Sequence, residues 1–190
     1  MMKKKVFRMP TQVTINARSS SITNAFVNGI IPCIEPSEEE VKKALEVLGM
    51  SEDDVRCAYC GDKATEWDHF HPLIVNRKPT GYISEIQNLV PACGKCNQSK
   101  GNKEWEKWMN SDAVLSPKTR GVVDLDERIE RLEKYEEQFV PTKYDFKTIV
   151  GEKLWKEHMD NLDEIIKMMK KAQITSDEIK RVIVESVKKQ

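Results

Sequence analysis

The sequence contains no long hydrophobic run. None of its apolar stretches approaches the roughly 20 residues that a membrane-spanning helix needs. The lysines near the N-terminus are not followed by an apolar segment, so the pattern of a secretory signal peptide is missing as well. We therefore expect a cytoplasmic protein that does not act at a membrane.

Net charge is absent too, because 31 basic residues balance 31 acidic ones. A nucleic-acid-binding protein of this composition must gather its basic residues in one place. They do gather near the N-terminus, ahead of the first acidic residue. The members of this N-terminal basic cluster are Lys3, Lys4, Lys5, Arg8 and Arg18. A solvated, frayed chain end is the alternative interpretation.

Internal repeats and low-complexity segments are also missing, and so is the aromatic motif of an RNA-recognition module. What is present is a chain of 190 residues with 39% hydrophobic and 33% charged residues. This composition allows one core with appended, well-solvated helices.

Short-range patterns predict the elements of the first 54 residues. Val13, Ile15 and Ala17 alternate with polar residues, which predicts a strand, and the serines at 19–21 predict a turn. Ser37 and the glutamate three residues later form a capping box for a helix over 37–48. The glycine at position 49 suits the left-handed end of that helix.

The last third of the chain has a helical pattern. Apolar residues recur at helical spacing from position 124 onward. They predict a helix over 124–139, a second over 146–172, and a third that starts at Ser176 or Asp177. The apolar stripes serve either as ordinary packing faces or as a dimer interface. A short helix is expected over 103–110, and the tryptophans at 67, 105 and 108 are expected in the core.

Four of the five cysteines form two CxxC pairs, Cys57 with Cys60 and Cys93 with Cys96. Two intervening residues let both thiolates of a pair turn toward one ion, and two pairs complete a tetrahedral zinc shell. No coordination position stays open, so the predicted zinc is structural. Four buried free thiols or a redox pair are the alternatives. Cys33 stands alone and is expected to be a small buried residue.

Between and after the cysteine pairs, the sequence resembles the HNH, or ββα-metal, nuclease family. The resemblance rests on Asp68-His69 with Pro72, on Asn88-Leu89, and on the second cysteine pair followed by Asn97 and Lys100. It covers residues 57–102. It implies an α+β fold, in which flanking helices and a helical C-terminal region surround a zinc-stabilised ββα-metal core.

The resemblance also implies roles for individual residues. His69 is the general base that takes a proton from the attacking water. Asp68 and Asn97 are ligands of a catalytic Mg²⁺ or Mn²⁺ ion, although Asn97 alternatively caps the helix after Cys96. Asn88 holds a loop or orients the imidazole of His69. His71 is expected to be an ordinary loop histidine.

Lys100 lies one helical turn after Asn97 and is expected to contact a phosphate, with a plain surface lysine as the alternative. Other basic residues are candidate DNA contacts on charge alone. These candidates are Arg77, Lys78, Lys95, Lys103 and Arg18, with Lys118 and Arg120 as weaker ones. Glu66 shares a strand face with Asp68 and is expected to contact the ligands of the ion without binding the ion itself.

These residues suggest three parts. Residues 1–54 form an N-terminal segment with one helix and a DNA contact, 55–110 the zinc-containing nuclease core, and 122–190 a helical region. The function they favour is a metal-dependent endonuclease that cuts double-stranded DNA, as a restriction or defence enzyme and as a homodimer. The alternative is a zinc-stabilised DNA-binding module without catalysis.

Overall fold

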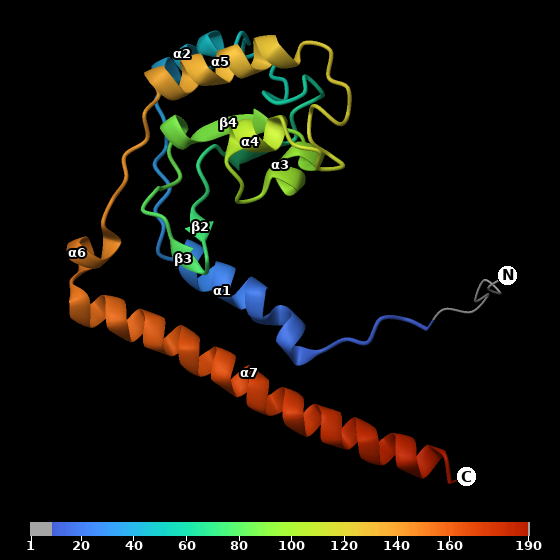
Figure 1. Ribbon diagram of the computed structural model, residues 1–190. Helices are drawn as coiled ribbons and strands as arrows, with labels where there is room; N and C mark the ends of the chain where they lie inside the picture. The colour runs from blue at the N-terminus through green and yellow to red at the C-terminus, as the bar shows by residue number, and fades with distance from the viewer. Residues whose placement is uncertain (1–8, 190) are drawn as a thin grey trace, which may run out of the picture. The chain divides into compact units, whose positions relative to one another are not determined.

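The computed structural model describes residues 9–189 and has an α+β fold (Figure 1). Two compact units share the chain. One consists of Val27–Ile149, and the other combines the described part of Met1–Phe26 with Val150–Gln190. No helix in the described range is long and apolar enough to cross a membrane.

A two-stranded sheet lies at the centre of the unit formed by Val27–Ile149. Strand β1 (Glu66–His69) pairs antiparallel with β4 (Leu89–Ala92), so that His69 lies opposite Leu89. The short helix η2 (Ile86–Asn88) leads into β4, and α3 (Gly94–Lys100) follows it and packs on β1. The predicted strand that ends in Asp-His is confirmed.

A second, smaller sheet is a tight hairpin of β2 (Ile74–Val75) and β3 (Lys78–Pro79). The two turn residues, Asn76 and Arg77, both have positive φ angles, 51° and 65°. Positive φ at both central residues is the geometry of a type I′ turn, whose twist matches that of paired strands. The hairpin places Arg77 and Lys78 at its exposed tip.

Helix α2 (Glu38–Val47) begins as predicted. The Ser37 side chain accepts a hydrogen bond from the Glu40 amide, and the Glu40 carboxylate accepts one from the Ser37 amide, so the capping box is confirmed. Gly49 has a φ of 69°, which confirms the left-handed helix end. Helix α4 (Trp105–Met109) also lies within its predicted range.

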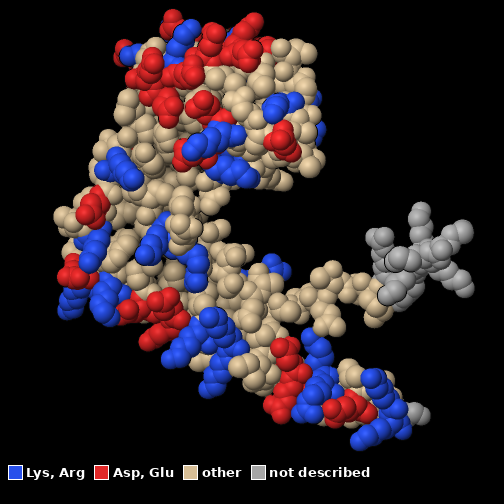
Figure 2. Space-filling model, viewed as in Figure 1, with Lys and Arg blue, Asp and Glu red and all other residues tan. Residues whose placement is uncertain are grey.

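Helix α5 (Leu125–Gln138) packs beside α2. Figure 2 shows that acidic side chains gather over these two helices. On its inner side, α5 contributes Leu132 and Tyr135, both completely buried in the main hydrophobic core. The Tyr135 hydroxyl donates to the carbonyl oxygens of Ile86 and Leu89, at 2.5 and 2.9 Å. Contacts thus join α5 to the segment that contains η2 and β4, whereas the sequence suggested a boundary before α5.

The other unit differs from the sequence expectation at both of its ends. The segment expected as a strand and a turn forms η1 (Ile15–Arg18) and α1 (Ser19–Asn28). The strand prediction is wrong because Thr14 caps η1: its hydroxyl accepts a hydrogen bond from the Ala17 amide at 3.2 Å. The Ser19 carbonyl accepts one from the Thr23 hydroxyl inside α1, so the serines continue a helix.

The C-terminal helices break at a different residue from the one predicted. Helix α6 (Phe146–Val150) ends before Gly151, which has a φ of 84°, and α7 runs without interruption over Glu152–Val187. The predicted break at Ser176 is absent because the helix packs against η1 there. Gln173 accepts a hydrogen bond from the Ile15 amide at 2.6 Å and donates one to Asp177 at 2.7 Å.

We predict that Tyr135→Phe lowers the free energy of unfolding by about 1–3 kcal/mol, because two buried carbonyl groups lose their donor while the ring packing remains. Urea unfolding followed by circular dichroism measures this loss. Tyr144→Phe is the matched control, since Tyr144 is 37% exposed. Equal midpoints for the two variants would contradict the anchoring role of Tyr135.

Candidate active site

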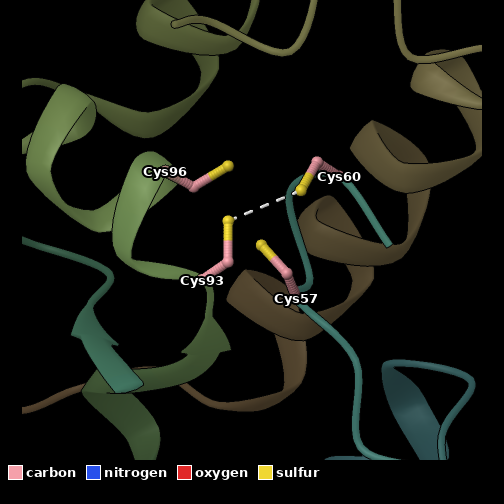
Figure 3. Close-up of side chains that lie close together, drawn as sticks. All are labelled: Cys57, Cys60, Cys93 and Cys96. Atoms are coloured by element: carbon pink, nitrogen blue, oxygen red, sulfur yellow. Dashed lines mark hydrogen bonds between the residues drawn. The ribbon is translucent and has the colours of Figure 1, made fainter. Parts of the chain in front are cut away.

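The four paired cysteines converge at one point, and Figure 3 shows their sulfur atoms turned toward one another. Their sulfurs all lie within 4.8 Å of one another, and Cys60 and Cys93 are 3.7 Å apart. A tetrahedral zinc ion with Zn–S bonds of about 2.3 Å requires S···S distances of about 3.8 Å. The cluster therefore fits a zinc ion.

The chemistry of the thiols supports the same conclusion. Hydrogen bonds with Cys57 and Cys96 lower the pKa of Cys60, whereas hydrogen bonds with Cys57 and Cys60 raise the pKa of Cys96. A thiolate at Cys60 thus makes a second thiolate at Cys96 unfavourable. A divalent ion removes this conflict because it binds the thiolate form of every cysteine.

Residues next to the cysteines pack closely around the cluster and donate hydrogen bonds to it. Gly61 turns the first pair with a φ of 76°, and a side chain there would collide with Arg128. Arg120 donates to Cys96 at 3.2 Å and pairs with Asp62 at 2.7 Å. Arg120 thus places a positive charge beside the cysteine sulfurs, and its role as a DNA contact stays a prediction. Cys33 is exposed, which corrects the expectation that it is buried.

Asp68 is buried in the middle of β1, and one of its carboxylate oxygens has two partners. The Tyr59 hydroxyl donates to Asp68 Oδ2 at 2.6 Å, and Lys100 Nζ lies 3.0 Å from the same oxygen. Burial raises the pKa of Asp68, while the Lys100 charge acts in the opposite direction. In the described part of the chain no hydrogen bond to Asp68 Oδ1 is found.

Lys100 does not lie on the surface, which corrects the expected phosphate contact. Its side chain is fully buried, and its ammonium group also donates to the His69 carbonyl at 2.7 Å. A lysine can be buried when a paired carboxylate replaces the water that it loses. In this structure Lys100 instead holds the end of β1 through its contacts with Asp68 and His69, the expected metal ligand and the expected general base.

The His69 ring is held by a residue that the sequence did not point to. Its Nε2 lies 2.8 Å from Ser84 Oγ. Ser84 is fixed in turn, since its amide bonds the Pro32 carbonyl and its carbonyl accepts from the Ile34 amide. Burial, and then the charge of Lys100, lower the pKa of His69 to about 4. The imidazole is therefore neutral at neutral pH.

Asn88 is fully buried and holds a loop, as one of its two predicted roles requires. Its Oδ1 accepts from the His71 amide at 2.7 Å, and its Nδ2 donates to the carbonyls of His71 and Ile83. The His71 ring stacks on Tyr82 and lies 3.3 Å from Glu136. Asn88 thus shapes the chain after His69 without touching its imidazole.

Asn97 faces β1 from α3. Its Nδ2 donates to Glu66 at 2.6 Å. The helix cap is Cys93, three residues before Cys96, so the interpretation of Asn97 as the cap is wrong. Gly94 leaves room for Glu66, because an added Cβ would lie 2.9 Å from its Oε1. Two adjacent contacts therefore join β1 to α3, one between Glu66 and Asn97 and one between Asp68 and Lys100.

The remaining candidates differ in exposure. Arg77, Lys78 and Lys95 are exposed in the same unit. Lys103 is exposed, but its ammonium donates to the Ser99 carbonyl at the end of α3. Arg18 is exposed in the other unit. The rest of the N-terminal basic cluster lies outside the described residues.

The tryptophans divide into two groups. Those at 105 and 108 are buried as expected. Trp67 is 51% exposed, so its core assignment is wrong. It lies two residues before His69 on β1, and alternate strand residues share a face.

We predict that Cys96→Ala loses zinc and lowers the unfolding temperature of the protein by more than 10 °C, since zinc-binding energy is folding energy. Zinc content from mass spectrometry and melting by circular dichroism test this. Cys33→Ala is the matched control and keeps one zinc ion per chain. A Cys96→Ala protein with normal zinc content and stability would refute the metal site.

Comparison with known proteins agrees with this geometry. Residues 57–103 match the family model of the HNH endonuclease. Over 73 residues, or 36% of the chain, the sequence is 36% identical to the CRISPR-associated endonuclease Cas9 of Corynebacterium diphtheriae. The chain spans only 6% of the length of that relative, and no solved structure matches. Residues 57–103, which contain both cysteine pairs, β1, β4 and α3, are therefore an HNH endonuclease domain.

Proposed function

We propose that this protein is a metal-dependent endonuclease that hydrolyses phosphodiester bonds in double-stranded DNA. The observation that carries the proposal is the His69 ring, which is neutral and is oriented by Ser84 at the end of the strand that holds Asp68. A neutral imidazole accepts a proton, and a fixed ring accepts it from one direction.

The oxygen atoms near α3 suit a hard divalent cation. Asp68 Oδ1 and Asn97 Oδ1 both lack a hydrogen bond among residues 9–189. Carboxylate and amide oxygens are the ligands that Mg²⁺ and Mn²⁺ prefer. Asp68 and Asn97 would hold this ion, with Glu66 orienting the Asn97 amide. When bound, the ion stabilises negative charge on the phosphate and the leaving oxygen.

The His69 imidazole has one nitrogen available for the attacking water. With the ring proton on Nε2, Ser84 Oγ accepts a hydrogen bond from this nitrogen, and the lone pair on Nδ1 is available. Because the pKa of His69 is about 4, most of the protein carries this ring in its basic form at neutral pH. Lys100 keeps the His69 backbone in place through its hydrogen bond to the carbonyl.

We assign the DNA contacts within this unit to exposed residues near the two ends of the site. Lys95 extends from the start of α3, while Arg77 and Lys78 extend from the β2–β3 hairpin. Lysine and arginine bind phosphates without reading the sequence. Exposed Trp67 adds an aromatic face on the His69 side of β1. Lys103 completes the basic contacts proposed for this unit. Arg18 is a separate candidate contact in the other unit.

The biological role that we infer is restriction or defence by cutting both strands. Cutting both strands is simplest for a dimer that carries two active sites. The relative from Corynebacterium diphtheriae is a CRISPR-associated endonuclease, which supports a role in this general class. A zinc-stabilised DNA-binding module without catalysis is the competing function, and it would not need the buried support of Asp68 or the fixed ring of His69.

We predict that the protein nicks or linearises supercoiled plasmid in the presence of Mg²⁺ or Mn²⁺, and that His69→Ala slows cleavage by about 10²–10⁴-fold through loss of the general base. His158→Ala is the matched control, because His158 contacts Phe26 in the other unit. Zinc content and melting curves establish that all three proteins are folded.

The outcomes of this assay separate the functions. Discrete DNA fragments would support a restriction enzyme. If wild type shifts the plasmid on a gel without cleaving it in either ion, the binding module replaces the nuclease. If His69→Ala cleaves as fast as wild type, His69 is not the base.

We predict that the protein forms a homodimer through α7, with a doubled mass in light scattering. The helix exposes apolar residues three and four positions apart, including Met168, Ile179 and Val182 at 62%, 56% and 50% exposure. Met168→Glu with Ile179→Glu should yield monomers. The matched control, Lys167→Glu with Lys180→Glu, should stay dimeric. Monomeric wild type at micromolar concentration would overturn the dimer.

A further inference from the structure

Tyr59 belongs to the first cysteine pair and also touches Asp68. It lies between Cys57 and Cys60, its side chain is completely buried, and its hydroxyl donates to Asp68 Oδ2 at 2.6 Å. The ring edge packs on Trp108, with the ring centroids 5.2 Å apart at 88°. Burial and ring packing thus tie the position of the hydroxyl to that of the first cysteine pair.

The second partner of Asp68 lies on the helix that carries the second cysteine pair. Lys100 ends α3, the helix that Cys93 caps and in which Cys96 lies. Its ammonium group is 3.0 Å from the same Oδ2 atom. Each cysteine pair thus carries one of the two groups that hold Asp68. An ion that joins the two pairs sets the separation of the Tyr59 hydroxyl and the Lys100 ammonium.

The Tyr59 hydroxyl and the Lys100 ammonium both contact Asp68 Oδ2, so Asp68 Oδ1 is the oxygen that can bind a cation. With Oδ2 occupied twice, the plane of the carboxylate is fixed and Oδ1 remains for a further ligand. A carboxylate held in one orientation binds a cation with less loss of side-chain freedom than a rotating one.

We propose that the four-cysteine zinc site is a positioning device for Asp68, and that Tyr59 is the positioning residue through which it acts. Zinc in the cysteine cluster holds Tyr59 and Lys100 on either side of the carboxylate and directs Oδ1 to the divalent ion of the active site. Zinc occupancy thus raises the affinity of the second metal site, beyond its contribution to folding. The inference rests on the proposed function in taking Asp68 as a ligand of that ion.

The variant that tests this is Tyr59→Phe, which keeps the ring against Trp108 and removes only the hydroxyl. Binding of Mn²⁺ is measured by the electron paramagnetic resonance of the free ion, on protein with one zinc per chain. We expect the dissociation constant for Mn²⁺ to rise about 10–100-fold, the usual effect of removing a group that orients a metal ligand. Plasmid cleavage should fall at low Mn²⁺ and recover at saturating Mn²⁺.

Two further variants make the result decisive. Tyr144→Phe, a half-exposed tyrosine in the same unit, should bind Mn²⁺ like wild type. Asp68→Asn should bind Mn²⁺ much more weakly than either. If Asp68→Asn binds Mn²⁺ normally, the ligand assignment in the proposed function is wrong. If Asp68→Asn loses binding but Tyr59→Phe binds like wild type, the coupling through Tyr59 is overturned while the nuclease assignment stands.

If Tyr59→Phe does not fold, the coupling is tested on the wild-type protein by replacing its zinc with cadmium. Cadmium in place of zinc binds the same four sulfurs but is a larger ion, so it spreads the two cysteine pairs. We expect the cadmium-loaded protein to bind Mn²⁺ more weakly than the zinc-loaded protein at equal helix content. Identical Mn²⁺ affinities for the two forms would overturn the coupling.

Discussion

The burial of the Asp68 carboxyl group inside the protein is the constraint on which the nuclease domain depends. A buried charge is costly unless opposite charge and hydrogen-bond donors replace the water around it. Lys100 supplies the charge and Tyr59 the donor. Both groups are held by parts of the chain that the cysteine cluster joins. The arrangement of β1, α3 and the cysteine cluster thus brings two polar partners to one acidic group in the interior.

The same ammonium group links the two halves of the site. Lys100 pairs with the Asp68 side chain and bonds the His69 carbonyl, so it contacts consecutive residues of one strand. Its charge also lowers the pKa of His69. One buried lysine therefore favours an ionised acid and a neutral base side by side.

Much of this site could be predicted from spacing. The two CxxC pairs and the Asp68-His69 dipeptide are local patterns, and the capping box of Ser37 is another. The burial of Lys100 could not be predicted in this way, because it depends on the distance between β1 and α3 in the folded chain. Ser84 lies 15 positions after His69 in the sequence and contacts its ring directly. Backbone hydrogen bonds with Pro32 and Ile34 hold Ser84 in place, and no local pattern predicts them. The helical turn η1, which replaces the strand expected near Ile15, is capped by Thr14 and is also bound by Gln173, near the other end of the chain.

The hairpin of β2 and β3 has the shortest connection that two antiparallel strands allow. Arg77 has a φ of 65°, a conformation that costs an L-residue other than glycine about 1–2 kcal/mol. A two-residue turn has few alternative conformations, so the guanidinium and the neighbouring ammonium are carried on a stiff support. The hairpin tip therefore loses little conformational entropy when it binds a partner. The backbone strain is present in the free protein, before any partner arrives.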